Sequence, residues 1–334
     1  YGYVLIDPIC GAIGAFSTGD GISTGGQART PICKMPNIEH TEQSFPLLFL
    51  YRRELTDSGG AGKYRGGLSG VSCFVPHGTD QITHDTLASG CAIPTSIGMM
   101  GGYPSTTNGY LFVRDSDILD RFARARMPED AGEIAGERVT LGLRQENFAQ
   151  MPRDVYAVWW CGGGGFGDPM ARDPALVEKD VEDLAVTVES ARAIYGVVVD
   201  PSTLRADLAT SRALREEVRR ARVARHGRPA ARRDGDTLLA VTDALVAKAD
   251  ARGRFLACAT CGVWLGDLRE NYKAGCIREE HPIERSNPLV GEPGRFIDDR
   301  VIFRQFFCPG CGRLVENEVA VESEPLLHDI ELDL

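Results

Sequence analysis

Four cysteines in the last part of the chain form two matched pairs. The pairs are Cys258-Ala-Thr-Cys261-Gly262 and Cys308-Pro-Gly-Cys311-Gly312. Two thiolates on one tight turn can reach the same small cation, and a second pair completes a tetrahedral set of ligands. A glycine after each second cysteine favours the turn, because glycine accepts positive φ. The spacing predicts one zinc ion held by Cys258, Cys261, Cys308 and Cys311. Two disulfides or four buried thiols are the alternative. Four protein ligands leave no open position, so this zinc is expected to be structural.

Two glycine-rich stretches in the first half of the chain are candidates for binding an anion or a substrate. They are Asp57-Ser-Gly-Gly-Ala-Gly-Lys-Tyr-Arg-Gly-Gly-Leu-Ser-Gly70 and Cys161-Gly-Gly-Gly-Gly-Phe-Gly-Asp-Pro169. Successive glycine amides can form an anion-binding nest, to which Lys63 and Arg65 would add positive charge. The candidate positions are Gly59, Gly60, Gly62, Gly163 and Gly164. A structural turn in the first stretch and a packed crossover in the second are the favoured alternatives. The spacing of a Walker loop is absent.

No motif in the sequence identifies catalytic residues. The weak candidates are Lys63, Arg65 and His40. The histidine lies between carboxylates in Glu39-His40-Thr41-Glu42, which allows an acid–base or metal-binding role. A surface cluster of hydrogen bonds is the favoured interpretation of that stretch. The sequence contains no GxSxG, no HExxH and no GxGxxG that follows a strand.

Short strands joined by glycine-rich turns are expected in the first half of the chain. The clearest β-type runs are residues 47–51, 71–75 and 109–113. The chain begins at Tyr1 without a methionine, inside a strand-like run over residues 3–6. We therefore expect that its start is not a natural domain edge, and that it is a fragment, a processed piece or half of a domain completed by another chain.

Helices are expected in the middle of the chain. Asp173 and the proline that follows it predict one helix start, and Thr187 predicts another. A third, arginine-rich helix is expected over residues 201–226, and residues 227–235 have the composition of a linker. The predicted fold class is α+β, with a β-rich glycine-laden domain, then helices, then a small β-type domain that carries the four cysteines.

The overall charge is acidic. The net charge of −10 and the pI of about 5.2 argue against a nucleic-acid-binding zinc domain, whose surface should be basic. The third helix is an exception to the acidic balance. An anionic partner would suit its arginines, but a solvated face interleaved with Glu216 and Glu217 is favoured. The arginines are Arg212, Arg215, Arg219, Arg220, Arg222 and Arg225.

The composition places the chain in a reducing compartment. No apolar run approaches the length of a membrane span, and no secretory signal is visible. The remaining cysteines have no disulfide-framework spacing, as in cytosolic proteins with free thiols. A cytoplasmic location is expected, with neither a membrane nor a nucleic acid as partner.

Residues 1–200 resemble the C-terminal half of the hydantoinase B/oxoprolinase family. The resemblance implies that the family's long N-terminal half is absent from this chain. It is carried, in order, by Glu39 through Pro46, by Asp57-Ser-Gly-Gly-Ala-Gly-Lys-Tyr-Arg-Gly-Gly-Leu, by Gly162-Gly-Gly-Gly-Phe-Gly-Asp-Pro, by Arg172-Asp-Pro, by Asp180-Val and by Ala191-Arg-Ala-Ile-Tyr-Gly-Val.

Residues 236–334 resemble the small gamma subunit of acetone carboxylase, and residues 201–235 form the basic helix and linker between the two parts. The carrying residues are Cys258-x-x-Cys-Gly, Asp267-Leu-Arg-Glu-Asn-Tyr-Lys273 and Arg304-Gln-Phe-Phe-Cys-Pro-Gly-Cys-Gly-Arg-Leu-Val-Glu316.

Together the resemblances imply a subunit of a cytoplasmic, multi-subunit, ATP-dependent ketone carboxylase of the acetone and acetophenone carboxylase group. Such an enzyme joins a ketone to bicarbonate through a phosphorylated enol and carboxyphosphate, and yields a 3-oxo acid. The implied partners are a hydantoinase-A-like subunit and the missing N-terminal hydantoinase-B-like half, or another such subunit. ATP and Mg or Mn are expected on other chains, so this chain alone is expected to be inactive.

Two alternative hypotheses remain. One is a subunit of an ATP-dependent hydantoinase- or oxoprolinase-type cyclic-amide hydrolase. The other is a non-catalytic subunit whose zinc domain holds a complex together. In the carboxylase reading, we hypothesise that the two glycine stretches donate hydrogen bonds to the oxyanions of the reactants.

Overall fold

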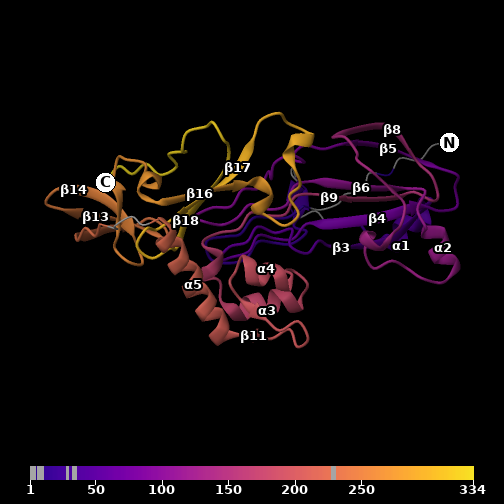
Figure 1. Ribbon diagram of the computed structural model, residues 1–334. Helices are drawn as coiled ribbons and strands as arrows, with labels where there is room; N and C mark the ends of the chain where they lie inside the picture. Colours follow the sequence, from indigo (N-terminus) through magenta and orange to yellow (C-terminus); the bar gives the residue numbers. More distant parts are fainter. Residues whose placement is uncertain (1–4, 6–10, 28–29, 32–35, 227–230) are drawn as a thin grey trace.

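The computed structural model describes residues 5, 11–27, 30–31, 36–226 and 231–334. The molecule is elongated, with a large sheet at one end, a smaller sheet at the other, and three helices along one side between them (Figure 1). This confirms the mixed α+β fold, which is mostly strand with few helices. The strand expected over residues 3–6 lies outside the described residues except for Leu5, and the expected linker is described from residue 231 onward. Among the described helices, none is long and apolar enough to cross a membrane.

A five-stranded antiparallel sheet forms the core of the first half. Its strand order is β3-β4-β9-β6-β7. Alternate residues of β4 and β9 point to opposite faces, as the strand period of two requires. Phe74 and Tyr156 therefore belong to one hydrophobic cluster, and Val75 and Val155 to another. The strands are β3 (Leu47–Glu54), β4 (Gly70–Pro76), β6 (Gly109–Arg114), β7 (Glu137–Val139) and β9 (Val155–Trp159).

Both faces of this sheet are covered. A two-stranded ribbon lies over one face, where the His84 ring stacks on Tyr156 with 4.5 Å between ring centroids. Short helices cover the other face, and Ile118 is fully buried there. The ribbon consists of β5 (Ile82–Leu87) and β8 (Arg144–Gln150), and α1 (Ile38–Ser44) packs on the same face. The other face is covered by α2 (Ile118–Ala123) and the 3₁₀ turn η1 (Ala131–Glu133). A small hairpin, β1 (Gly26–Gln27) with β2 (Thr30–Pro31), precedes them.

Four extended, glycine-rich segments run side by side between the large sheet and the helices, and we call them the glycine bundle (Figure 1). Their residues are 11–26, 58–70, 96–107 and 161–167. They form no regular ladder, and their backbones are joined by scattered hydrogen bonds, such as those from the amide of Gly163 to Gly67 O and from the amide of Gly165 to Tyr103 O. A β-carbon added at Gly66 would lie 1.8 Å from Gly163 O, which shows why these segments need glycine.

Two short helices pack beside the bundle and begin where the sequence predicts. In α3 (Pro174–Glu182) the Asp173 side chain accepts from the Ala175 amide, with proline in the first turn. In α4 (Val188–Ala193) Thr187 accepts from the Ser190 amide, and Gly196 beyond it has φ +63°. The 3₁₀ turn η2 (Pro169–Ala171) precedes α3, and the pair β10 (Val198–Val199) and β11 (Ala206–Asp207) follows α4.

The third helix, α5 (Leu208–His226), begins later than the sequence analysis predicts. The Asp200 side chain accepts from the amides of Ser202 and Thr203 and folds residues 200–203 into a turn. Asp207 then accepts from the Thr210 amide at the start of the helix. Pro201 belongs to this turn and not to the helix, because the local hydrogen bonds of Asp200 compete with helix formation.

Two antiparallel sheets, with strand orders β12-β13-β14-β15 and β16-β17-β18, make up the last part of the chain. Every residue of β17 is buried. The strands are β12 (Asp236–Ala240), β13 (Leu245–Asp250), β14 (Gly253–Cys258), β15 (Trp264–Asp267), β16 (Ile277–Pro282), β17 (Val301–Phe307) and β18 (Leu314–Val321). The 3₁₀ turns are η3 (Tyr272–Gly275), η4 (Ile283–Arg285) and η5 (Pro293–Arg295).

One hydrophobic cluster crosses the predicted boundary between the parts of the chain. It contains Val177 and Tyr195 from the helical region together with Ile277 and Phe303 from the second sheet. The edge of the Tyr103 ring, from the glycine bundle, packs on Phe303 with 5.2 Å between ring centroids. The divisions at residues 200 and 235 stay predictions, and the parts they separate share a core.

Replacing Gly66 by alanine is expected to destabilise the protein by about 3 kcal/mol or more, because the new methyl group would meet a backbone oxygen that cannot move aside alone. Urea unfolding followed by circular dichroism measures this. Gly291→Ala is the control, since a β-carbon there meets nothing within 4 Å, and it should change the unfolding free energy by less than about 0.5 kcal/mol. Equal stability of the two variants would contradict the packing role of Gly66.

Candidate metal centre and adjoining pocket

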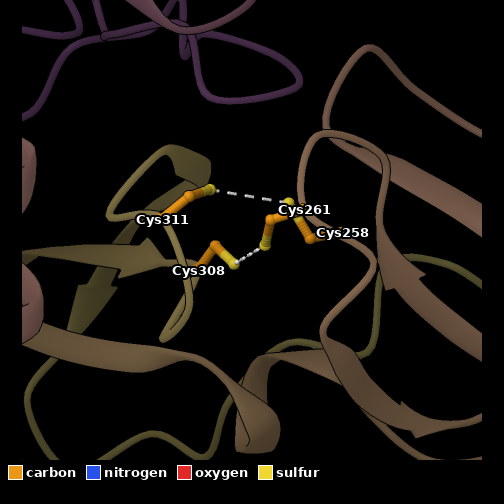
Figure 2. Close-up of side chains that lie close together, drawn as sticks. All are labelled: Cys258, Cys261, Cys308 and Cys311. Atoms are coloured by element: carbon orange, nitrogen blue, oxygen red, sulfur yellow. Dashed lines mark hydrogen bonds between the residues drawn. The ribbon is translucent and has the colours of Figure 1, made fainter. Parts of the chain in front are cut away.

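The structure brings the four paired cysteines together into one cluster (Figure 2). Cys258 ends β14, and Cys308 directly follows β17, so each pair comes from a different sheet. The Sγ atoms of Cys258 and Cys311 lie 3.8 Å apart, those of Cys261 and Cys308 lie 3.5 Å apart, and all four lie within 4.8 Å of one another.

These distances fit a tetrahedral metal and not disulfides. Zinc bonded to four sulfurs at about 2.3 Å separates the sulfurs by about 3.8 Å, whereas a disulfide bond is about 2.05 Å long. The cysteines are free thiols in the structure. The donor set therefore suits zinc, and all four positions around the ion would be filled by protein.

The two turns that carry the thiols have the same geometry. The amide of Gly262 donates to Cys258 O (2.9 Å), and the amide of Gly312 donates to Cys308 O (2.8 Å). Gly262 and Gly312 have φ +71° and +68°, in the region that glycine occupies without strain. The glycine after each second cysteine therefore has the role that the sequence analysis assigned to it.

Hydrogen bonds among the thiols shift their pKa values in opposite directions. Hydrogen bonds from the Cys308 and Cys311 thiols lower the pKa of Cys258, and the same bonds to the Cys258 thiolate raise the pKa values of Cys308 and Cys311. A metal ion would replace these shared protons, because only thiolates bind it. Metal binding by the four cysteines would therefore release protons.

Helix α5 connects this centre to the glycine bundle. A β-carbon on Gly312 would lie 2.3 Å from Arg219 O, so the second cysteine turn packs directly on the helix backbone. Arg222 donates to Gly312 O (3.2 Å) and lies over the Phe307 ring. Arg215 donates to Tyr195 O and Arg172 O. The interpretation of these arginines as a solvated face is therefore wrong for Arg215 and Arg222, which brace neighbouring segments.

The three weak catalytic candidates lie in different settings. Arg65 pairs with the buried Asp180 (3.2 Å), and the adjacent Arg172 pairs with both Asp180 and Asp20. Lys63 pairs with Asp243 of the cysteine-bearing half (2.5 Å). His40 is exposed on α1, which packs against β3 at the far end of the large sheet (Figure 1). Lys63 and Arg65 lie in the same segment of the glycine bundle, whereas His40 lies apart from them. The catalytic roles of all three residues stay predictions.

The five candidate glycines are buried inside the glycine bundle. The amide of Gly60 donates to Gly163 O, that of Gly163 to Gly67 O and that of Gly164 to Ser96 Oγ. A β-carbon on Gly59 or Gly62 would meet backbone atoms at 2.3 Å and 2.5 Å. These positions serve the close approach of neighbouring segments, and anion binding at Gly59, Gly60, Gly62, Gly163 or Gly164 stays a prediction.

The sequence analysis missed a pocket of about 630 Å³ beside the glycine bundle. Its walls are residues 97–104 of the bundle, residues 316–320 of β18 and the tail segment 324–330. Lys273 and Glu316 line it. Both lie within the stretches quoted for the gamma-subunit resemblance, which is the signal that could have directed attention to them.

The Lys273 ammonium is enclosed by the tail and β18. Its side chain is 0% exposed, and Nζ lies 2.6 Å from Glu318 Oε1 and 2.8 Å from Asp329 Oδ2. It also donates to Leu327 O (3.0 Å). A buried charge needs such partners, because leaving it unpaired would cost several kcal/mol.

Comparison with known proteins matches the two halves of the chain to two families. Residues 1–169 match the hydantoinase B/oxoprolinase family, and residues 235–334 match the acetone carboxylase gamma subunit family. The chain is 30% identical over 222 residues to the acetophenone carboxylase delta subunit of Aromatoleum aromaticum, covering 64% of this chain and 31% of that protein. It is also 39% identical over 80 residues to the acetophenone carboxylase beta subunit of the same organism, covering 23% of this chain and 62% of that subunit.

A solved structure agrees with the sequence matches. Nucleotide-free acetone carboxylase superposes with a TM-score of 0.57 and 28% identity, covering 66% of this chain and 31% of that one. The chain thus spans about a third of the length of the delta subunit and of the solved chain that it matches.

One zinc ion per chain is expected in the purified protein, and Cys308→Ser should lower the bound zinc to well below one per chain, because it removes a buried ligand. Elemental analysis measures the metal. Cys276→Ser is the matched control: Cys276 is buried in the same hydrophobic cluster without being one of the four, so its zinc content should stay at one. Wild-type protein without zinc, or full zinc in Cys308→Ser, would contradict the assignment.

Proposed function

The chain belongs to the hydantoinase B/oxoprolinase family, and from this we propose that it is a subunit of an ATP-dependent ketone carboxylase. The observation that carries the proposal is the second match: the same chain ends in a domain of the acetone carboxylase gamma subunit family. Its two halves are similar to two different subunits of one enzyme, acetophenone carboxylase. A chain that unites both parts is best explained by the reaction that those parts serve together.

The contact between the halves supports a shared role. The amide nitrogen of the Asn317 side chain donates to Gly101 O (2.9 Å) and Gly102 O (3.1 Å), and the Gly101 amide donates to Glu316 Oε1 (2.9 Å). Gln305 donates to the Tyr103 hydroxyl (2.8 Å). These bonds are buried or half-buried and recognise backbone positions of the glycine bundle, so the cysteine-bearing half is docked in one defined position.

The proposed reaction joins a ketone and bicarbonate at the expense of ATP and gives a 3-oxo acid. Bicarbonate is a poor electrophile, and a ketone is a poor nucleophile at neutral pH. Phosphorylation of both, to carboxyphosphate and an enol phosphate, would solve this, and the C–C bond would then form in a cavity that excludes water. In this proposal ATP and its Mg or Mn bind on other chains, and zinc on the four cysteines is a structural clamp.

The proposed partners are those that the family resemblances imply. They are a hydantoinase-A-like subunit, which would handle ATP, and the N-terminal hydantoinase-B-like part or another subunit that contains it. The complex would work in the cytoplasm, where the free thiols of this chain would stay reduced. Alone, the chain is proposed to be inactive.

Two other functions are separable by experiment. A cyclic-amide hydrolase would share the first half of the chain, whereas the gamma-type half favours a carboxylase. A purely structural subunit would bind the complex and contribute no residue to the reaction. The carboxylase is favoured because the pocket described above lies where the two halves meet, and not on a surface far from their contact.

The complex that copurifies with this chain should hydrolyse ATP only when a ketone and bicarbonate are both present. Phosphate release is measured with acetone or acetophenone as the ketone. Hydantoin, 5-oxoproline and a lactam are tested separately as alternative substrates. The isolated chain, which should be inactive, is the control. Hydrolysis stimulated by a cyclic amide without bicarbonate would replace the carboxylase by a hydrolase, and a complex that lacks any hydantoinase-A-like chain would contradict both.

A further inference from the structure

The pocket between the glycine bundle and β18 has the size and lining of a small-molecule site. Its volume of about 630 Å³ lies within the range of about 300–1,000 Å³ that ligand pockets occupy. Two apolar side chains of the bundle, Ile97 and Met99, line it and are 62% and 58% exposed. Val319, Ala320 and Leu326 add to the apolar wall. Such a surface favours an uncharged ligand with an apolar body.

The charged groups of the pocket exclude an anion as its ligand. Among the described residues that line it, the buried cation is Lys273, and it is already paired with Glu318 and Asp329. Glu316 and Glu324 add two more acidic side chains to the lining. Bicarbonate, carboxyphosphate or a nucleotide would meet carboxylates without a free positive charge, so none of them suits this site.

One carboxyl group stands out as a polar contact for a neutral ligand. Glu316 is 7% exposed, and the amides of Gly101 and Asn317 both donate to its Oε1. Burial raises the pKa of Glu316 to about 7. Near neutral pH a large share of this group is therefore the uncharged acid, whose hydroxyl can donate a hydrogen bond to a carbonyl oxygen.

A second carboxylate of the lining, Glu318, is buried and paired with two cations. Glu318 is 8% exposed, its Oε1 holds Lys273, and its Oε2 has no hydrogen-bond partner. This Oε2 is instead in an ion pair with Arg304 Nη1, at 3.5 Å. The charge of Glu318 is thus balanced by cations of the protein itself, and this carboxylate needs no ligand.

We propose that this pocket takes up the ketone before its phosphorylation on another chain, with the carbonyl oxygen held by Glu316 and the apolar part against Ile97 and Met99. This inference rests on the proposed carboxylase function and adds to it the substrate's place, at the junction of the two halves. It also gives the gamma-type half a direct contact with the substrate, in addition to its proposed role in holding a structural zinc. Only a chain that holds both halves has this site complete.

Binding of 4′-fluoroacetophenone to the purified full chain, followed by fluorine NMR, tests the site without any turnover. The Ile97→Asp variant is expected to bind the probe about tenfold more weakly, because the ligand would strip water from a new carboxylate. Leu87→Asp is the matched control: Leu87 is an apolar side chain of β5, 76% exposed and outside the pocket lining, and its variant should bind as the wild type does. Equal binding by both variants would overturn the proposal.

The pH dependence of the same binding tests the role of Glu316. The acid form donates the hydrogen bond, so affinity should be highest below pH 7 and fall as the pH rises through about 7. Glu316→Gln keeps a donor that does not titrate, and its affinity should stay level between about pH 6 and 8. Lys273, Asp329 and His328 also line the pocket, and among them His328 is a histidine. His328→Gln is therefore the control and should keep the fall with pH. A level profile in the wild type, or a fall that survives in Glu316→Gln, would refute the role.

A kinetic measurement separates this inference from the proposed function. In the intact complex, Ile97→Asp should raise the KM for the ketone about tenfold and leave that for bicarbonate unchanged. If this variant hydrolyses ATP in the presence of the ketone with an unaltered KM, the carboxylase function is supported and the ketone pocket is refuted. A complex that hydrolyses cyclic amides would refute the carboxylase function. The binding of the fluorinated ketone to the isolated chain would then still show whether the pocket takes a ketone.

Discussion

The close approach of backbone segments in the glycine bundle is the constraint on which the rest of the molecule depends. Neighbouring segments come so near that a β-carbon on Gly102 would lie 2.0 Å from Gly165 O. At such distances the amides and carbonyls of irregular segments can bond to one another, which buried backbone groups require. Glycine loses more conformational entropy on folding than other residues do. The hydrogen bonds and the shared core around Tyr103 offset that loss.

The metal centre and the bundle are held in one assembly by helix α5. The cysteine pairs come from two sheets, so a bound ion would tie β14 to β17. Gly312 rests on the backbone of α5, whose Arg219 lies 3.5 Å from Asp168, directly after the second glycine stretch. The connection from the candidate metal centre to the bundle therefore consists of packed backbone and the ion pair between Arg219 and Asp168.

The sequence predicts local features well and tertiary ones poorly, for physical reasons. Cysteine spacing and the capping residues Asp173 and Thr187 act within a few positions, so they can be recognised without a fold. A glycine run shows only that the backbone is free to approach something. Whether Gly163 faces a ligand or another segment depends on residues far along the chain, here Gly67 and Gly60. The pocket depends on three distant segments and could not be predicted from periodicity.

The buried cations of the gamma-type half are better explained by the tail that they hold than by stability. Arg304 donates to the carbonyls of Glu322, Glu324 and Pro325, and Lys273 donates to that of Leu327. Burying an ion pair rarely adds net stability over apolar residues of the same size. A tail without helix or ladder needs donors for its carbonyls, and the five guanidinium protons of arginine supply several at once. The segment so fixed forms one wall of the pocket, and thus the charge network determines the shape of the site.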